Sequence, residues 1–78
     1  MLKYLKTFED EVIVRYTYKP WGKGQGGTVE FNKENDDVIK MERAKTDKFG
    51  RYMGHMISEL HRMNKQKQFK NNGEVAWG

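Results

Sequence analysis

Apolar residues with helical spacing between residues 46 and 68 constrain the fold of this chain more than any other feature. They recur at steps of three and four residues, which places them on one side of an α-helix: Phe49, Tyr52, Met53, Met56, Ile57, Leu60 and Met63. The opposite side carries polar and basic residues: Arg51, His55, Ser58, Arg62 and Lys65. Thr46 and Asp47 offer side-chain oxygens for the free N–H groups of a first turn. The sequence therefore predicts one long amphipathic helix over about residues 47–68.

Three segments before this helix alternate apolar and polar side chains, which is the pattern of a half-buried β-strand. The first spans residues 11–19 and places valines and tyrosines on one face. The second spans residues 28–32, with Val29 and Phe31 on one face. Residues 38–43 give a weaker pattern that suits an edge strand, where charged side chains are tolerated.

The two ends of the chain are less clearly patterned. Leu2 and Tyr4 favour an N-terminal strand. Leu2, Leu5 and Phe8 would also suit one or two helical turns, but we favour the strand. Residues 69–78, which follow the predicted helix, are interpreted as a short tail or a closing strand.

The chain of 78 residues is long enough for one domain with a thin core. We expect a single α+β domain over residues 1–78. Residues 1–43 form a small antiparallel sheet of three to four strands, and the long C-terminal helix packs on it. The absence of cysteine excludes disulfides, thiolate catalysis and cysteine zinc sites. No apolar run approaches the roughly 20 residues of a membrane span, and no secretory signal pattern is present, so we expect a cytoplasmic protein.

Positive charge is concentrated in the second half of the chain. Residues 1–39 hold six lysines and arginines against seven acids, whereas residues 40–78 hold nine against four. A basic surface of this kind attracts polyanions, such as nucleic acid or an acidic protein surface. The alternative is a solvated helix face that only keeps a small protein soluble.

The sequence holds no convincing pattern of catalytic or metal-binding residues. His55 and His61 are six residues apart, or about 120° of helical arc, and so do not face the same metal ion. Ser58, the only serine, has no identifiable oxyanion donors or third orienting group. The acids of residues 9–11 and 34–37 lack the spacing of a calcium-binding loop. We therefore predict a non-enzymatic binding protein with no cofactor and no metal.

A glycine-rich segment over residues 20–27 separates the first two strong strand patterns. Its glycines and Lys23 superficially resemble a phosphate-binding loop, but a strand pattern follows where that loop requires a helix. A flexible loop with Trp21 between Lys19 and Lys23 suits stacking on a base and contact with phosphate. The alternative is that Trp21 folds back over the thin core.

Two glycines, Gly50 and Gly54, interrupt the predicted helix. Each costs about 1 kcal/mol relative to alanine inside a helix, a cost that usually accompanies close approach of another backbone. We expect either tight packing of the helix on the sheet or a groove for a partner, including a second copy of this chain.

The predicted binding residues lie on the loop and on the basic side of the helix. They are Lys19, Trp21, Lys23, Arg51, His55, Arg62 and Lys65. These two surfaces predict nucleic-acid binding, to which Tyr16 and Tyr18 contribute only if their strand face is not the buried one. The alternative function is that of an accessory or inhibitory protein that docks on a larger protein partner.

Overall fold

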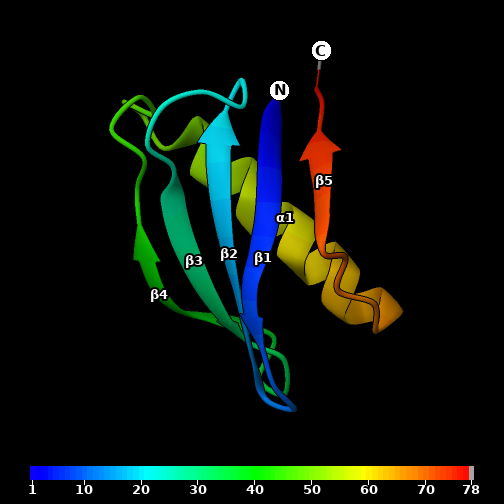
Figure 1. The fold of residues 1–78 in the computed structure, drawn as a ribbon. Coiled ribbons are helices and arrows are strands. Elements are labelled where there is room, and N and C mark those ends of the chain that lie inside the picture. Colours follow the sequence, from blue (N-terminus) through cyan, green and yellow to red (C-terminus); the bar gives the residue numbers. More distant parts are fainter. Residues whose placement is uncertain (78) are drawn as a thin grey trace.

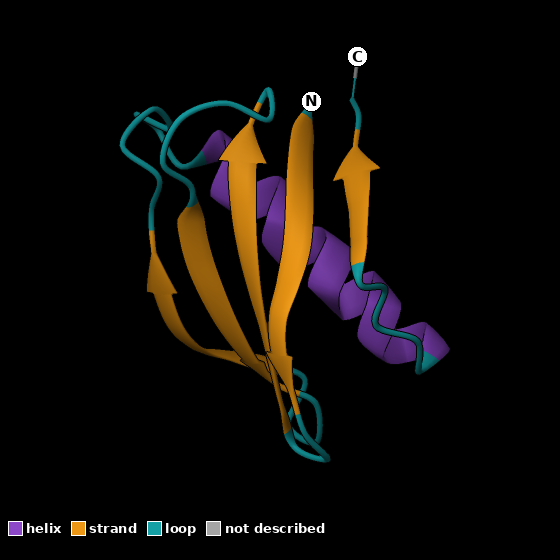
Figure 2. Cartoon of the chain, viewed as in Figure 1, coloured by secondary structure: helices purple, strands orange, loops and turns teal. Residues whose placement is uncertain are grey.

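The structure is a computed structural model that describes residues 1–77. Five strands form one antiparallel sheet in the spatial order β4-β3-β2-β1-β5, and a single helix lies across one face (Figures 1 and 2). In chain order the elements are β1 (Leu2–Glu9), β2 (Ile13–Pro20), β3 (Gly27–Asn32), β4 (Asp37–Glu42), α1 (Arg51–Gln66) and β5 (Asn72–Val75). The first four strands are a simple meander, and β5 returns after α1 to pair with β1.

The α+β class and the antiparallel sheet with one helix are confirmed, and two finer expectations are wrong. The sheet has five strands where three to four were predicted, since both ends of the chain are strands. The helix is not C-terminal, because β5 follows it. Val75 and Glu74 of β5 pair with Leu2 and Lys3 of β1. A four-residue strand with one valine carries little periodic signal, and its stability comes from this pairing.

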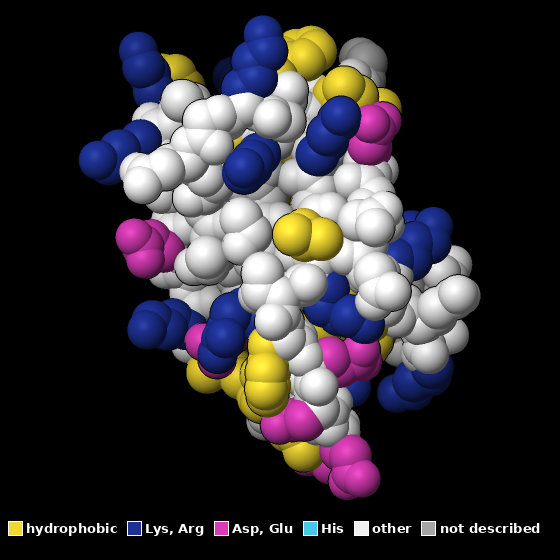
Figure 3. Space-filling model, viewed as in Figure 1, with side chains coloured by type: hydrophobic (Ala, Val, Ile, Leu, Met, Phe, Trp, Pro, Cys, Tyr) yellow, Lys and Arg dark blue, Asp and Glu magenta, His cyan; other side chains and the backbone are white. Residues whose placement is uncertain are grey.

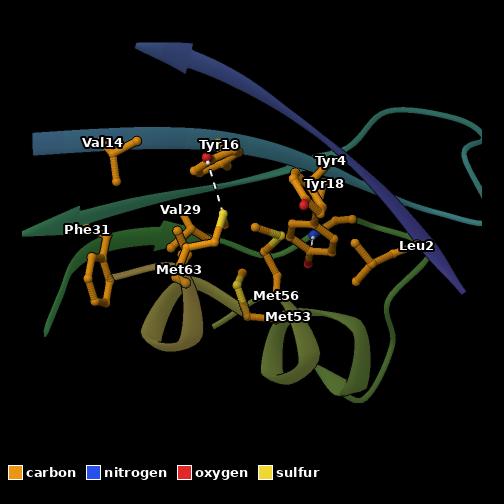
Figure 4. Close-up of a cluster of buried hydrophobic side chains, with 12 residues drawn as sticks. Leu2, Tyr4, Val14, Tyr16, Tyr18, Val29, Phe31, Met53, Met56 and Met63 are labelled. Atoms are coloured by element: carbon orange, nitrogen blue, oxygen red, sulfur yellow. Dashed lines mark hydrogen bonds between the residues drawn. The ribbon is translucent and has the colours of Figure 1, made fainter. Parts of the chain in front are cut away.

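The core lies between α1 and the face of the sheet that α1 covers (Figure 4). Alternate residues of β1, β2 and β3 meet the apolar side of the helix, and each of these side chains is buried: Leu2, Tyr4, Val14, Tyr16, Tyr18, Val29, Phe31, Met53, Met56, Leu60 and Met63. The Tyr16 hydroxyl contacts the Met63 sulfur at 3.6 Å and donates to the Lys70 carbonyl at 2.6 Å. Tyr16 and Tyr18 are therefore core residues and offer no ring to an external base.

The start of α1 is fixed by a buried network around Asp47, which is 1% exposed. Its carboxylate accepts the backbone N–H groups of Tyr52 at 3.2 Å and Met53 at 2.9 Å. It also accepts the Tyr18 hydroxyl at 3.0 Å, and that hydroxyl in turn accepts the N–H of Ala44 at 2.9 Å. Asp47 is thus the cap that the sequence predicted, acting from the interior of the protein. The Thr46 side chain, the other predicted cap, is exposed.

The predicted helix begins four residues too early because Gly50 adopts a left-handed conformation, with φ of 73°. This residue turns the chain just before Arg51 and leaves Phe49 outside α1, 85% exposed. Gly54 is exposed, and a β-carbon added there would meet no heavy atom of residues 1–77 within 4 Å. The expectation that Gly54 permits tight packing on the sheet is therefore wrong.

Burial of three core tyrosines predicts a characteristic alkaline titration. Burial raises the pKa of Tyr18 to about 12 and also raises the pKa values of Tyr4 and Tyr16. Because the folded state favours the neutral ring, this stabilisation is complete below the unfolded pKa of about 10 and is lost as the pH rises through about 12. Between about pH 9 and 11, we expect less tyrosinate absorbance at 295 nm from native protein than from protein in urea. If native protein and protein in urea give the same titration curve, this prediction is contradicted.

Candidate functional site

The predicted basic side of α1 is divided between two distant ends of the molecule. Arg51 is its first residue and Lys65 lies in its last turn, so the two are separated by about 21 Å along the helix axis. Arg62, near Lys65, forms a salt bridge with Glu59 and donates to Gln66 at 3.3 Å. The hydrogen bonds from Arg62 hold the pKa of the Glu59 carboxyl below its usual value. These basic residues therefore do not form one continuous site.

A polar hollow of about 630 Å³ lies at the C-terminal end of α1, between the helix and the β3–β4 turn. Four of its seven ionisable side chains are paired: His61 lies 3.1 Å from Asp36, Lys33 pairs with Glu9, and Arg62 pairs with Glu59. The Asn64 amide also donates to Asp36 at 2.9 Å. The hydrogen bonds from Asn64 and His61 lower the pKa of Asp36, and the bond from Asn64 has the larger effect. The carbonyl end of a helix is also its negative end, which disfavours an anion. This hollow is the weaker candidate.

The opposite end of the molecule gathers aromatic side chains from three separate segments. Trp21 comes from the loop between β2 and β3, Phe49 and Tyr52 flank the start of α1, and Trp77 follows β5 (Figure 1). Trp21, Phe49 and Trp77 are 61%, 85% and 38% exposed, a degree of exposure that leaves ring surface free for a ligand. The interpretation of Trp21 as a cover for the core is therefore wrong.

Two adjacent hollows, both open to solvent, connect these aromatic residues. One, of about 290 Å³, is lined by Thr46, Asp47, Lys48, Phe49, Arg51, Tyr52 and Trp77. The other, of about 400 Å³, is lined by Pro20, Trp21, Lys23, Gly24, Thr46 and Tyr52. Thr46 and Tyr52 belong to both hollows, so the two form one continuous surface. We name this surface the aromatic end and define it by Trp21, Lys23, Lys48, Phe49, Arg51, Tyr52 and Trp77.

Trp77 is held in place by two aromatic contacts. Its ring stacks on His55 with 3.8 Å between the ring centroids and 12° between the planes. The Tyr52 ring meets it edge-on at 5.2 Å. His55, a predicted binding residue, is half-buried with one ring face covered by Trp77, so its position suits support of Trp77 better than direct contact with a ligand.

The basic residues of the aromatic end are free of acidic partners. Lys23, Lys48 and Arg51 are exposed, and within residues 1–77 none of them forms a salt bridge. The nearby carboxylate of Asp47 is buried and occupied by its three donors. Lys19 is exposed near the end of β2, on the open face of the sheet and opposite Lys3 of β1.

On the open face of the sheet, basic and acidic side chains are unevenly distributed along the strands (Figure 3). Lysine and arginine side chains dominate the end at which both chain termini lie, whereas acidic side chains gather at the opposite tip. That tip is the turn between β1 and β2, which contains Asp10 and Glu11. Other lysine and arginine side chains lie across the middle and at the lower right of this view, so the acidic tip is the clearer of the two features.

Sequence reasoning identified Trp21, Lys23 and Arg51 but missed the other aromatic residues of this surface. Phe49 and Tyr52 are in phase with the buried stripe of the helix. Trp77 lies in the segment interpreted as a short tail or a closing strand. Gly50, directly after Phe49, was the available signal, because a glycine at that position favours a break before the helix.

Clusters of metal-ligating side chains and membrane-spanning helices are both absent from residues 1–77. Among residues 1–77 there is no group of three or more histidine, cysteine, aspartate and glutamate side chains arranged to hold a metal ion. Over the same residues, no helix has both the length and the apolar character needed to cross a membrane. Comparison with known proteins found no family model, no curated protein and no solved structure that matches this chain.

Proposed function

We propose that this protein binds single-stranded nucleic acid through the aromatic end. The observation that carries the proposal is the meeting of exposed rings and unpaired cations on one surface built from three segments. Stacking of a base on an aromatic side chain contributes about 1–3 kcal/mol and tolerates any base. Lysine and arginine add a salt-dependent attraction to phosphate. Nothing in this role requires catalysis.

A single strand fits the aromatic end better than a duplex does. The rings of Trp21 and Phe49 stand in open hollows and can stack only on a base whose face is accessible. Bases in a duplex are already stacked on each other, so their faces are hidden. The acids at the opposite tip would repel a polyanion, and the unpaired Lys23, Lys48 and Arg51 would attract it to the aromatic residues.

The sharpest test compares two arginines that differ in position but not in charge. Arg51→Glu should weaken binding of a random single-stranded oligonucleotide by about tenfold or more, an effect of about 1.4 kcal/mol. Arg62→Glu makes the same change in net charge at the paired, distant end of α1 and should alter affinity less than about twofold. Fluorescence anisotropy of a labelled oligonucleotide measures both variants.

Salt dependence supplies the second half of this test. Each phosphate of a single strand that a cation neutralises contributes about −0.7 to the slope of log affinity against log salt concentration. If Lys23, Lys48 and Arg51 each neutralise one phosphate, the slope should be about −2. A duplex of the same sequence should bind more weakly. The proposal fails if single strands do not bind at about 50 mM salt, or if the two arginine variants lose affinity equally.

A second candidate function is docking on a protein partner through β4. This strand is an edge of the sheet, and its Ile39 and Met41 are 51% and 58% exposed. An edge strand with apolar side chains can accept a strand from a partner. This geometry favours the role of an accessory or inhibitory protein.

Capture from the native cell tests this candidate when matched variants are compared. Met41→Lys changes β4, whereas Leu5→Lys changes an equally exposed apolar residue, 54% exposed, on another strand. A partner that is retained by Leu5→Lys and lost by Met41→Lys would support docking at β4. Equal capture by both variants would exclude β4 as the contact.

A further inference from the structure

We infer that the aromatic end holds two successive bases of a single strand, one in each hollow, so that a two-base step is its unit of recognition. This inference rests on the proposed function and specifies the ligand of the same site. It follows from the division of the surface into two compartments, each with its own exposed ring and its own cation.

Each compartment combines exposed aromatic and basic side chains, and the two are built mainly from different segments. The hollow of about 290 Å³ has Phe49 and Trp77 as rings and Lys48 and Arg51 as cations. The hollow of about 400 Å³ has Trp21 as its exposed ring and Lys23 as its cation. Both volumes lie near the lower end of the range of about 300–1,000 Å³ for ligand pockets. Each therefore suits one planar base better than a stacked pair.

Tyr52 lines both hollows and so lies where they meet. We infer that its ring acts as a wall between them. Its backbone N–H is bound to Asp47, and its ring meets Trp77 edge-on at 5.2 Å, so the wall is held from two sides. A held wall prevents two bases from stacking on each other and separates them into neighbouring compartments. Thr46 also lines both hollows and is exposed, so this residue would lie beside the link between the two bases.

The number of bases can be tested with oligonucleotides that have bases at only a few chosen positions and abasic residues at all the others. We expect an oligonucleotide with two adjacent bases to bind almost as tightly as one of equal length that has a base at every position. A single base should bind about tenfold more weakly than two, because one stacking contact is missing. Two bases separated by several abasic residues should bind no better than one.

Tryptophan fluorescence assigns the bases to the hollows. Trp21→Phe and Trp77→Phe each leave one tryptophan and retain an aromatic ring. The oligonucleotide with two adjacent bases should quench the remaining tryptophan in both variants. Trp21→Ala, which removes an exposed ring, should bind the one-base and two-base oligonucleotides with equal affinity.

The outcomes separate this inference from the proposed function. If the oligonucleotide with a base at every position does not bind, both the inference and the proposed function fail. If it binds but one base suffices, or affinity continues to rise to four or more adjacent bases, the two-base unit is wrong while nucleic-acid binding stands. Quenching of only one tryptophan would likewise overturn the assignment of one base to each hollow.

Discussion

Asp47→Ala is expected to lower the free energy of unfolding by roughly 3 kcal/mol or more. The change removes the acceptor for three donors: the Tyr18 hydroxyl and the N–H groups of Tyr52 and Met53. A buried donor without a partner costs about 1–3 kcal/mol, and α1 also loses its N-terminal cap. Since small domains are stable by about 5–15 kcal/mol, this loss is a large fraction of the total stability.

Urea unfolding followed by circular dichroism measures this loss. Glu34→Ala removes an exposed carboxylate and should change stability by less than about 0.5 kcal/mol. Tyr18→Phe should fall between the two variants, because Ala44 loses its acceptor while Asp47 keeps two of its three donors. A loss below about 1 kcal/mol in Asp47→Ala would show that the buried network does not hold the start of α1.

Gly27→Ala should be the second severely destabilising change, with a loss of about 3 kcal/mol. An added β-carbon would overlap the Tyr18 ring and lie 2.5 Å from the Glu42 carbonyl oxygen and 2.6 Å from the Ala44 nitrogen. Two of these three neighbours are backbone atoms, which cannot move away without displacing β4 or the segment after it. We therefore expect a loss at the upper end of the usual cost of overpacking.

The matched control for Gly27→Ala is the same substitution at Gly54, where the opposite sign is expected. Gly54→Ala should raise stability by about 1 kcal/mol, because alanine favours the helix and the added methyl group meets no described atom. Both midpoints can be measured in one series of urea titrations. Equal effects of the two substitutions would contradict the packing at Gly27.

The candidate site was only partly predictable from the sequence, for a local reason. Trp21 and Lys23 lie in a glycine-rich loop whose irregularity is evident from composition, and Arg51 follows from helical phase. Phe49 has the same phase as Met53 and Met56, yet the left-handed Gly50 takes it out of the helix. Helical spacing alone cannot show where a helix begins.

Arg62 shows a feature that helical phase alone does not give, namely its ion pair. Its helical phase placed it on the exposed basic side, and it is exposed. Its charge is nevertheless occupied by Glu59, three residues earlier on the same helix. That spacing brings side chains together on a helix surface, so this pairing was visible in the sequence.

The sequence by itself determined the local elements of this protein. The amphipathic helix and the alternating strands follow from side-chain periodicity, which is a property of neighbouring residues. Only the tertiary structure decided that residues 72–75 pair with β1, because so short a strand is stable only beside a partner. The same pairing brings Trp77 to Tyr52 and His55, and so assembles an aromatic surface from segments about 25 residues or more apart in the chain. Contacts over such separations depend on packing, which no local pattern encodes.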